Sequence, residues 1–450
     1  MDRKITIISS MFLLLTATAC LRDEIPGGQP VSGQEQTSLD LKSVNTSEAA
    51  VEGTLAVLLT KDAAASVAGG AASEALAQAC VQTGASLQMA FQCKGTDRER
   101  EYRLDRWYLV TFPADVDVEA VAEAFAACSE VQAVQYNTRI ARFEEGVATG
   151  WVAGDNTVSP VLPFNDPKLI DQWHYINNGD LSVASTVRAG ADVNVRDAWR
   201  LTTGDPSIIV AVCDEGVKYD HPDLAANMWV NEAELNGVEG VDDDGNGYKD
   251  DVYGYNFVGG SAKINFDSHG THVAGTIAAL NNNGIGVCGV AGGYYPDKPG
   301  VRVMALQVID DNYPEGTASL PKVYQYAAEN GAVILNNSWG YAQTLKVMPT
   351  ADKEAIDYFV KYAGIDQNGN QTGPMKGGLA IFAAGNESED LAYPAAYEKV
   401  LAVAALGPKG EAAYYTNYGD WIDVCAPGGD HKVDRQYGGI YSIGLENTYN

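Results

Sequence analysis

Five short apolar runs, separated by stretches with helical spacing, constrain the fold of the second half of this chain more than any other feature. The runs are residues 208–213, 303–308, 333–335, 379–384 and 400–404. Each is apolar at consecutive positions, so both faces of the strand it forms must be buried. Such strands belong to parallel sheets with helices on either side. Residues 165–450 are therefore predicted to form a three-layer α/β/α domain.

Two intervening stretches carry helix signals. Ser319 is a suitable helix cap and Pro321 suits a first turn, which predicts a helix that ends near Gly331. Residues 350–362 repeat apolar side chains at helical spacing.

The region 51–143 has a different pattern. Strand-like runs at 55–59, 107–112 and 131–136 alternate with helical stretches at 71–82 and 118–127. This order predicts a small, separate α+β domain. Residues 144–164 show no periodic pattern and are predicted to be a linker.

The N-terminus resembles a bacterial lipoprotein signal. Arg3 and Lys4 precede an apolar run, and small residues then lead to Cys20. The run is too short for a membrane-spanning helix. Residues 1–20 are therefore predicted to be a signal peptide with Cys20 as the lipidated residue, although Ala17 stands where leucine is usual. Plain secretion is the alternative. Residues 21–50 are rich in Gly, Pro, Ser and Gln, which predicts a flexible tether.

The charge balance excludes one class of partner. The formal net charge is −29 at pH 7. Proteins that bind nucleic acid need basic patches that neutralise its phosphates. We therefore expect no nucleic-acid partner for this acidic chain.

Chemistry-bearing residues follow several of the predicted strands. Asp214 ends the first run, and His269 begins the helical stretch Gly-Thr-His-Val-Ala-Gly-Thr. The carboxyl ends of parallel strands meet at one edge of a sheet, where active sites gather. An aspartate there can orient a histidine base. Asn386 follows another strand, and its amide is suited to donate to an oxyanion.

The ordered set of Asp214-Glu-Gly, His269-Gly-Thr-His-Val-Ala-Gly-Thr, Ser338-Trp-Gly and Ala-Gly-Asn386 resembles the subtilases, serine peptidases of the subtilisin fold. The resemblance implies that His269, not His272, is the base and that Asn386 serves the oxyanion hole. It implies substrate binding by Ser338, Trp339, Gly340, Ala384 and Gly385. It also implies that domain 51–143 is a propeptide that assists folding and then inhibits the site. Taken alone, His269 and His272 have the spacing of a metal-binding pair.

The resemblance requires a nucleophilic serine in a Gly-Thr-Ser segment, and none of the 450 residues forms one. The nearest match, residues 316–319, lies between the wrong elements. Residues 439–447 resemble the strand just before the catalytic serine. The nucleophile is therefore expected after Asn450, and the 450-residue chain by itself is expected to be inactive. A partial reading of a longer gene and a naturally truncated product both fit this pattern.

An acidic segment suits Ca²⁺. Oxygen donors recur at alternate positions, with a glycine placed for a sharp turn. The predicted ligands are Asp242, Asp244, Asn246, the Tyr248 carbonyl, Asp250 and Asp251. A solvated acidic loop is the alternative. By resemblance alone, Asp223, Leu280, Asn282 and Val287 are expected at a second calcium site.

Six cysteines remain after Cys20. Cys213, Cys288 and Cys425 lie among apolar or small residues and are predicted to be buried. A bridge between Cys80 and Cys93 stays open.

Two function classes therefore stand. The first is a serine endopeptidase that is made as a zymogen, is stabilised by calcium and hydrolyses protein or peptide substrates. This enzyme is expected to be anchored by lipid in the bacterial cell envelope, with secretion as the alternative. The second is a non-catalytic surface lipoprotein derived from such an enzyme.

Overall fold

The computed structural model describes residues 37–142, 162–179, 187–310, 320–342, 347–366, 368–430, 432, 438–446 and 448–449. The predicted signal peptide with Cys20, the start of the tether and nearly all of the linker lie outside these residues. Residues Ser38–Asn450 form one compact unit. In the described part of the chain, every helix is too short or too polar to cross a bilayer.

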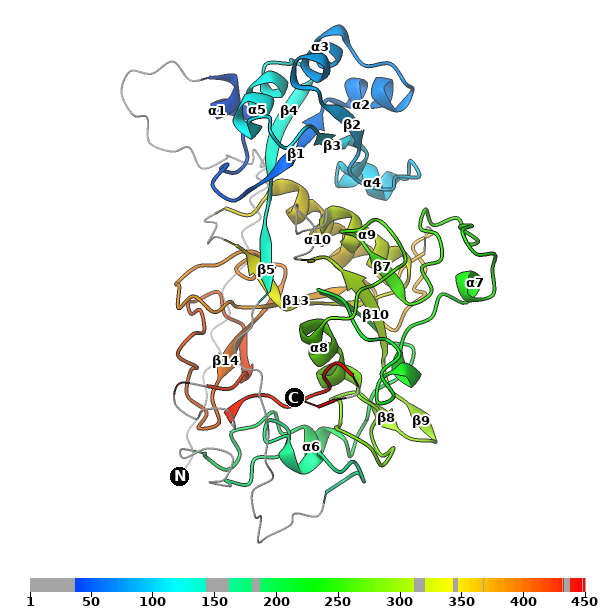
Figure 1. Ribbon diagram of the computed structural model, residues 1–450, viewed down its shortest axis with the longest axis vertical. Coiled ribbons are helices and arrows are strands. Elements are labelled where there is room, and N and C mark those ends of the chain that lie inside the picture. The colour runs from blue at the N-terminus through cyan, green and yellow to red at the C-terminus, as the bar shows by residue number, and fades with distance from the viewer. Residues whose placement is uncertain are drawn as a thin grey trace, which may run out of the picture. The chain divides into compact units, whose positions relative to one another are not determined.

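A parallel sheet of seven strands forms the centre of the larger domain (Figure 1). Its order is β15-β14-β13-β11-β6-β10-β7, and every neighbouring pair is parallel. The strands are β6 Ile209–Asp214, β7 Gly254–Asn256, β10 Arg302–Gln307, β11 Ile334–Asn337, β13 Leu379–Ala383, β14 Leu401–Leu406 and β15 Val424–Pro427. The five predicted strands are present. The edge strands β7 and β15 lack a long apolar run, because an edge strand is less deeply covered.

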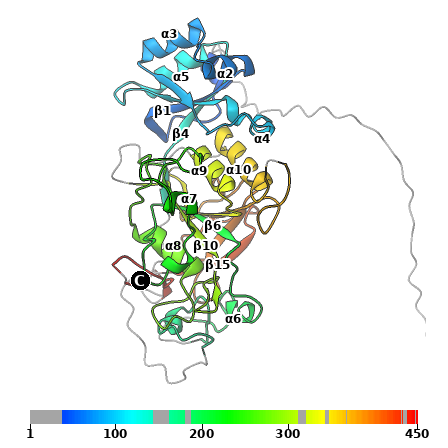
Figure 2. The ribbon, with the colours of Figure 1, turned by 90° about the vertical axis from the view of Figure 1, so that its right-hand side faces the viewer.

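Helices cover both faces of this sheet. Helix α8 (Ser268–Ala278) packs with Val210 and Val212 of β6, while α9 (Leu320–Glu329) and α10 (Thr350–Tyr362) pack with Ala211 and Cys213. Successive side chains of a strand point to opposite faces, so these contacts define three layers. The predicted three-layer α/β/α class is confirmed. Figure 2 shows α9 and α10 next to the N-terminal domain and α8 farther from it.

Short elements complete this domain. They are the helices α6 Val195–Ala198 and α7 Glu232–Leu235, the 3₁₀ turns η2 Leu169–Asp171 and η3 Ala225–Asn227, the hairpin β8 Gly293–Tyr294 with β9 Lys298–Pro299, and β12 Trp339–Tyr341.

The N-terminal domain has a four-stranded antiparallel sheet in the order β2-β3-β1-β4. Its strands are β1 Ala50–Leu59, β2 Ser86–Met89, β3 Trp107–Thr111 and β4 Val131–Thr138, followed by β5 Ile140–Arg142. Its helices are α1 Ser38–Lys42, α2 Lys61–Ala68, α3 Glu74–Thr83, α4 Asp97–Glu101 and α5 Val118–Ala126, with the 3₁₀ turn η1 Leu104–Arg106.

The two faces of this small sheet have different partners. Leu55 and Val57 pack with Phe125 of α5 in the domain's own core. Leu58 and Trp107 belong instead to the same hydrophobic cluster as α9 and α10. The small domain therefore shares part of its core with the larger one.

Two expectations need correction, and the pairing of Cys80 with Cys93, which the sequence left open, is decided. Residues 38–50 were expected in the tether, but they form α1 and begin β1, because Lys42 Nζ binds the carbonyls of Ala126 and Cys128 at the end of α5. Cys80 and Cys93 are free thiols, so they form no bridge. Cys425 is exposed, because it lies on the edge strand β15.

Candidate active site

Asp214 is the last residue of β6, near the middle of the seven-stranded sheet. Its side chain is 2% exposed. Its Oδ1 atom accepts a hydrogen bond from the Glu215 amide at 2.8 Å. The carboxylate is thereby fixed at the carboxyl edge of the sheet, as the sequence pattern predicts.

His269 lies in the first turn of α8, and its Nδ1 is 2.7 Å from Oδ1 of Asp214. The cap of this helix is Asp267, whose carboxylate accepts the His269 amide at 2.8 Å. A hydrogen on Nδ1 is assigned from the contact with Asp214, which leaves Nε2 as the basic nitrogen.

Two glycines allow α8 to approach β6 this closely. A Cβ atom on Gly270 would lie 2.2 Å from the Gly216 carbonyl oxygen and 3.1 Å from Cβ of Asp214. Gly216 itself has a φ of +120°, and a Cβ there would meet the Asn265 carbonyl at 2.0 Å. The distance between the aspartate and the histidine thus depends on the absence of side chains at both positions.

A cavity of about 320 Å³ opens beside His269. One wall is the face of α8 that carries His272 and Val273, and the opposite wall is formed by the ends of β13, β14 and β15. Ser338, Ala384, Gly385 and Asn386 all line it. Among the described lining residues, Ser338 is the one serine, and it lies in the segment expected to bind substrate. The structure therefore brings the predicted base, oxyanion donor and part of the substrate site to one cavity.

The two histidines of the His-Gly-Thr-His segment have separate contacts. His272 Nε2 lies 3.1 Å from the Ile440 carbonyl, whereas His269 faces Asp214. His221 is buried in a turn, where its Nδ1 accepts the Asp223 amide at 3.1 Å. In the described part of the chain, neither His269 nor His272 belongs to a metal-binding cluster.

The segment expected to bind substrate already pairs with another strand. β12 runs antiparallel to β5, with Gly340 opposite Ala141 and Trp339 opposite Arg142. Trp339 is buried, with its ring against Phe382. Figure 1 shows β4 and β5 as an extended ribbon that runs from the N-terminal domain towards β13. Sequence periodicity missed β5, because three residues carry no readable period.

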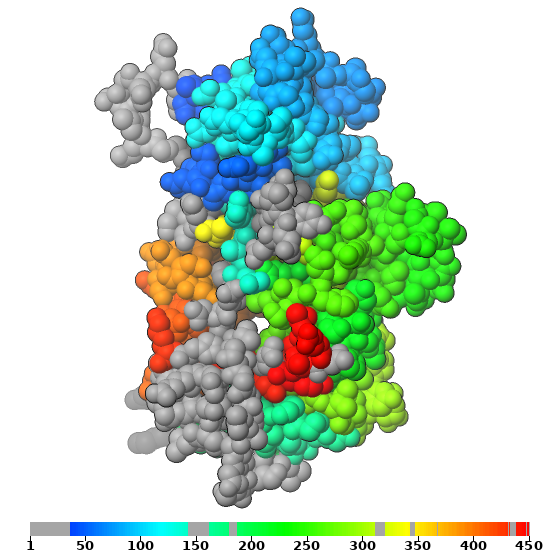
Figure 3. All heavy atoms as spheres, in the orientation of Figure 1, coloured from blue at the N-terminus to red at the C-terminus, as the bar shows by residue number. Residues whose placement is uncertain are grey.

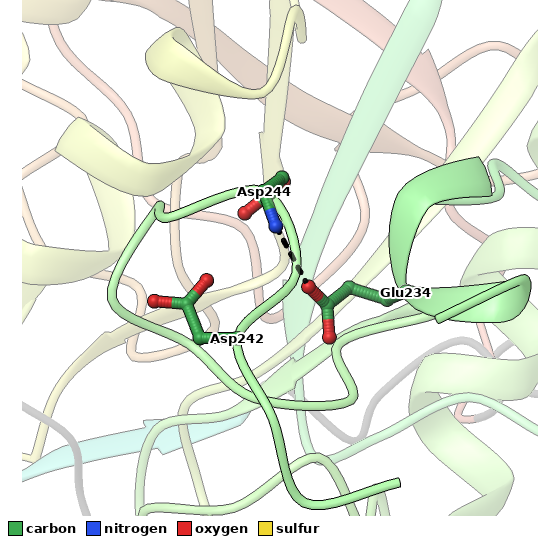
Figure 4. A group of neighbouring side chains, drawn as sticks. All are labelled: Glu234, Asp242 and Asp244. Atoms are coloured by element: carbon green, nitrogen blue, oxygen red, sulfur yellow. Dashed lines mark hydrogen bonds between the residues drawn. The ribbon is translucent and has the colours of Figure 1, made fainter. Parts of the chain in front are cut away.

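The acidic loop brings three carboxylates together. Oxygens of Glu234, Asp242 and Asp244 lie within 4.8 Å of one another (Figure 4). Glu234 comes from α7 and was missed, because it lies eight positions before the predicted loop. Its Oε1 accepts the Asp243 amide at 2.6 Å and the Asp244 amide at 3.3 Å.

Of the other predicted ligands, Asn246 lies against this group, since its side chain donates to Asp244 at 3.1 Å. Asn246 and Asp251 are joined by a hydrogen bond of 3.0 Å, and the Asp251 carboxylate also accepts from the Tyr326 hydroxyl. Asp250 turns to the Gly240 amide, at 2.9 Å. The ring of Tyr248 packs among aromatic rings, and the prediction for its backbone carbonyl stays a prediction. The three converging carboxylates supply only oxygen donors, which fits a hard cation such as Ca²⁺.

The residues expected at the second calcium site also lie together. Asp223 is buried, and its carboxylate accepts the Val287 amide at 3.0 Å and the Asn283 side chain at 2.6 Å. The Leu280 amide donates to the Asp223 carbonyl, at 2.8 Å. The Asn282 amide instead donates to Asp166, at 2.7 Å. Burial raises the pKa of Asp223 to about 8. Among the described residues, the side chains around Asp223 form no group of three converging metal-binding ligands like that of Glu234, Asp242 and Asp244, so the fit to a cation is weaker here.

Comparison with known proteins assigns a family to this arrangement. A profile described as "Subtilase family" matches residues 205–450. A "Thermophilic serine proteinase" of Bacillus sp. strain AK1 is 29% identical over 331 residues, 72% of this chain and 69% of that protein. "Halolysin" of Haloferax mediterranei is 29% identical over 325 residues, 71% of this chain and 54% of that protein. The chain thus spans little more than half the length of the second relative.

Solved structures agree on the fold. The crystal structure of fervidolysin from Fervidobacterium pennivorans, described as related to subtilisin, superposes with a TM-score of 0.57. The match covers 90% of this chain and 50% of that chain at 19% sequence identity. At this identity the likeness supports the architecture rather than a shared substrate.

Proposed function

We propose, from the premise that this chain belongs to the subtilase family of serine peptidases, that its Asp214–His269 pair serves peptide-bond hydrolysis through an acyl-enzyme. The observation that carries the proposal is the 2.7 Å contact between His269 Nδ1 and Asp214 Oδ1. It joins a buried carboxylate to an imidazole whose other nitrogen is left as a base at the edge of a 320 Å³ cavity.

The proposed reaction follows from this geometry. His269 Nε2 accepts the proton of a serine hydroxyl while the serine oxygen attacks the carbonyl carbon of the substrate. Asp214 holds the imidazole in the required tautomer and stabilises the imidazolium that forms. The imidazolium then gives its proton to the leaving amine, and water releases the acyl group by the same steps in reverse.

Asn386 is the proposed oxyanion donor. It lines the same cavity as His269 and lies just beyond the end of β13. Losing one such donor costs about 2.7–4 kcal/mol of transition-state stabilisation, a figure whose worked example is itself a subtilisin.

None of the 450 residues forms the Gly-Thr-Ser segment that carries the family's nucleophile. Among the described residues around the cavity, the one serine is Ser338, which directly precedes β12, the strand expected to bind substrate. Its hydroxyl accepts a hydrogen bond from the Asn336 side chain at 3.1 Å. We therefore propose that these 450 residues alone do not hydrolyse peptides, and that activity requires a serine supplied by further sequence.

The N-terminal domain is proposed to act as an inhibitor and folding aid. Two features support this role, namely the β5–β12 pairing on the substrate strand and the core shared with α9 and α10. An extended substrate would form the same antiparallel ladder with β12, so the domain and a substrate exclude each other.

Calcium is proposed to stabilise the loop of Glu234, Asp242 and Asp244. Three carboxylates at this distance repel one another when all are ionised, and a bound cation removes that repulsion. None of the described Lys or Arg side chains forms an ion pair with them. A second calcium at Asp223 is proposed on the resemblance alone. Anchoring to the bacterial cell envelope through Cys20, with secretion as the alternative, rests on the N-terminal sequence.

A fluorophosphonate probe, which labels activated serines, tests the proposal. We expect no labelling and no casein cleavage by the 450-residue chain, but both activities in a product of the same reading frame extended through a Gly-Thr-Ser segment. His269→Ala in the extended product should abolish labelling and self-processing. Retained processing would contradict the assigned base. A reading frame that stops after codon 450 would support the non-catalytic lipoprotein.

A further inference from the structure

Glu215 is a buried acidic residue next to the proposed catalytic aspartate. It directly follows Asp214 and is 5% exposed. Burying an ionised carboxylate is costly unless a partner compensates it. The partner of Glu215 therefore indicates what this position is built to hold.

A second carboxylate lies against the first. The side chain of Glu215 contacts that of Asp267, the cap of α8, and burial together with this contact raises the pKa of Glu215 to about 7. Two adjacent carboxylates favour either a shared proton or a cation between them. The nearby Lys218 is committed elsewhere, because its ammonium binds Asp220 at 2.7 Å.

The compensating cation comes from the N-terminal domain. Arg142, at the end of β5, forms an ion pair with Glu215. Its backbone lies opposite Trp339 in the antiparallel pairing of β5 with β12. Arg142 thus lies on the strand that pairs with β12, and its guanidinium binds the residue that directly follows Asp214 in the chain. In Figure 3, cyan atoms of this part of the chain reach the surface between the N-terminal domain and the larger one.

An ion pair that only held the two domains together would not need to lie beside β12, the strand expected to bind substrate. Among the described residues, Arg103 and Glu354 form another ion pair between the domains with a buried carboxylate, and this pair joins the residue before η1 to α10. Among the ion pairs of the described residues, that of Arg142 with Glu215 is the one that combines backbone pairing to β12 with a contact to the residue after Asp214.

We propose that Glu215 and Asp267 form a subsite for a cationic side chain of the substrate, and that Arg142 occupies this subsite within the chain. The inference rests on the proposed function and deepens it. The site selects peptides with arginine or lysine at the position that pairs opposite Trp339. The bidentate fork of arginine suits two carboxylates better than the point charge of lysine.

Hydrogen exchange tests the subsite without any catalysis. In the 450-residue chain, the amides of residues 140–142 should exchange about tenfold faster in Glu215→Gln and in Arg142→Met, because each loses a charge-assisted bond. The double variant should exchange no faster than the faster single variant. Glu411→Gln is a matched control, since it removes a carboxylate from an exposed ion pair with Lys409. The Arg142→Met variant leaves the larger domain unaltered, so it remains informative even if Glu215→Gln does not fold. An unchanged exchange rate of the amides of residues 140–142 in Arg142→Met would overturn the proposal.

Peptide cleavage tests the substrate class in the catalytically complete chain. The probe is a peptide of residues 137–147, compared with versions that carry Arg142→Lys or Arg142→Leu. We expect kcat/KM to fall about tenfold or more for the leucine peptide and less for the lysine peptide. This preference should be lost in Glu215→Gln enzyme and kept in Glu411→Gln enzyme.

The outcomes distinguish the proposed peptidase function from the proposed subsite for a cationic side chain. Equal cleavage of all three peptides would leave the peptidase function standing and overturn the subsite. Cleavage of none of them would contradict the proposed function, and the exchange result would then decide the subsite by itself.

Discussion

Trp107 Nε1 donates a hydrogen bond to Glu354 Oε2 across 2.7 Å and so joins β3 of the N-terminal domain to α10 of the larger domain. The tryptophan is fully buried, and Glu354 also pairs with Arg103. The two domains are therefore held by a buried polar contact inside a shared core.

Removing this donor should destabilise the chain. We expect Trp107→Phe to lower the free energy of unfolding by about 1–3 kcal/mol, because it leaves a buried carboxylate oxygen with one partner fewer. Denaturant titration followed by circular dichroism measures the change. Trp421→Phe is the control, since its indole donates to the Asp390 carbonyl at an exposed position, and it should change the free energy by less than about 0.5 kcal/mol. Equal effects of the two variants would contradict the role of the contact.

Gly270 should tolerate no side chain. A Cβ atom there would stand 2.2 Å from the Gly216 carbonyl oxygen, so Gly270→Ala must displace α8 and with it His269. We expect a loss of about 1–3 kcal/mol in stability from this overpacking. In the catalytically complete chain, self-processing should fall as well. Gly69→Ala is a suitable control, because the nearest atom to its Cβ lies at 3.4 Å, and normal processing by Gly270→Ala would refute the packing argument.

Calcium should raise the melting temperature through the acidic loop. We expect a chelator to lower the Tm of the wild-type chain, measured by differential scanning fluorimetry, because the three carboxylates then repel one another. Glu234→Gln should shrink the calcium-dependent shift. Glu232→Gln, on the same helix, should preserve it. A shift of equal size in both variants would remove Glu234 from the ligand set.

Asp352 should make stability depend on pH. Burial raises its pKa to about 7, and the Tyr341 hydroxyl donates to it at 2.8 Å. In the unfolded chain an aspartate titrates near pH 3.9. Between about pH 4 and pH 7 the folded state therefore binds more protons than the unfolded state, so stability falls as pH rises.

The slope from this one group is at most about 1.4 kcal/mol per pH unit. Denaturant titrations at pH 4.5, 6 and 7.5 measure it. Asp352→Asn should be less pH-dependent than wild type across this range, whereas Asp197→Asn, which alters an exposed ion pair with Arg200, should keep the wild-type slope. A wild-type slope in Asp352→Asn would mean that other groups carry the dependence.

The local sequence predicted the elements that carry Asp214 and His269 better than it predicted the residues around them. The apolar run that ends at Asp214 predicts a buried strand, and the small residues after His269 predict a closely packed helix, because both signals lie within a dozen positions. The order of these elements was enough to place Asp214 and His269 at one edge of the sheet. Residues 350–362, which became α10 with the same bounds, show how a strong helical period also fixes its own limits.

The sequence by itself predicted five of the seven strands of the central sheet, because each is a local run of apolar residues. Only the tertiary structure decided which distant groups meet. Arg142 and Glu215 stand 73 positions apart, and Trp107 and Glu354 stand 247 apart. No local period encodes such pairs, since they arise from the way whole elements pack. Glu234 entered the acidic cluster for the same reason, because the fold of α7, and not the spacing of the loop, turns its carboxylate towards Asp242 and Asp244.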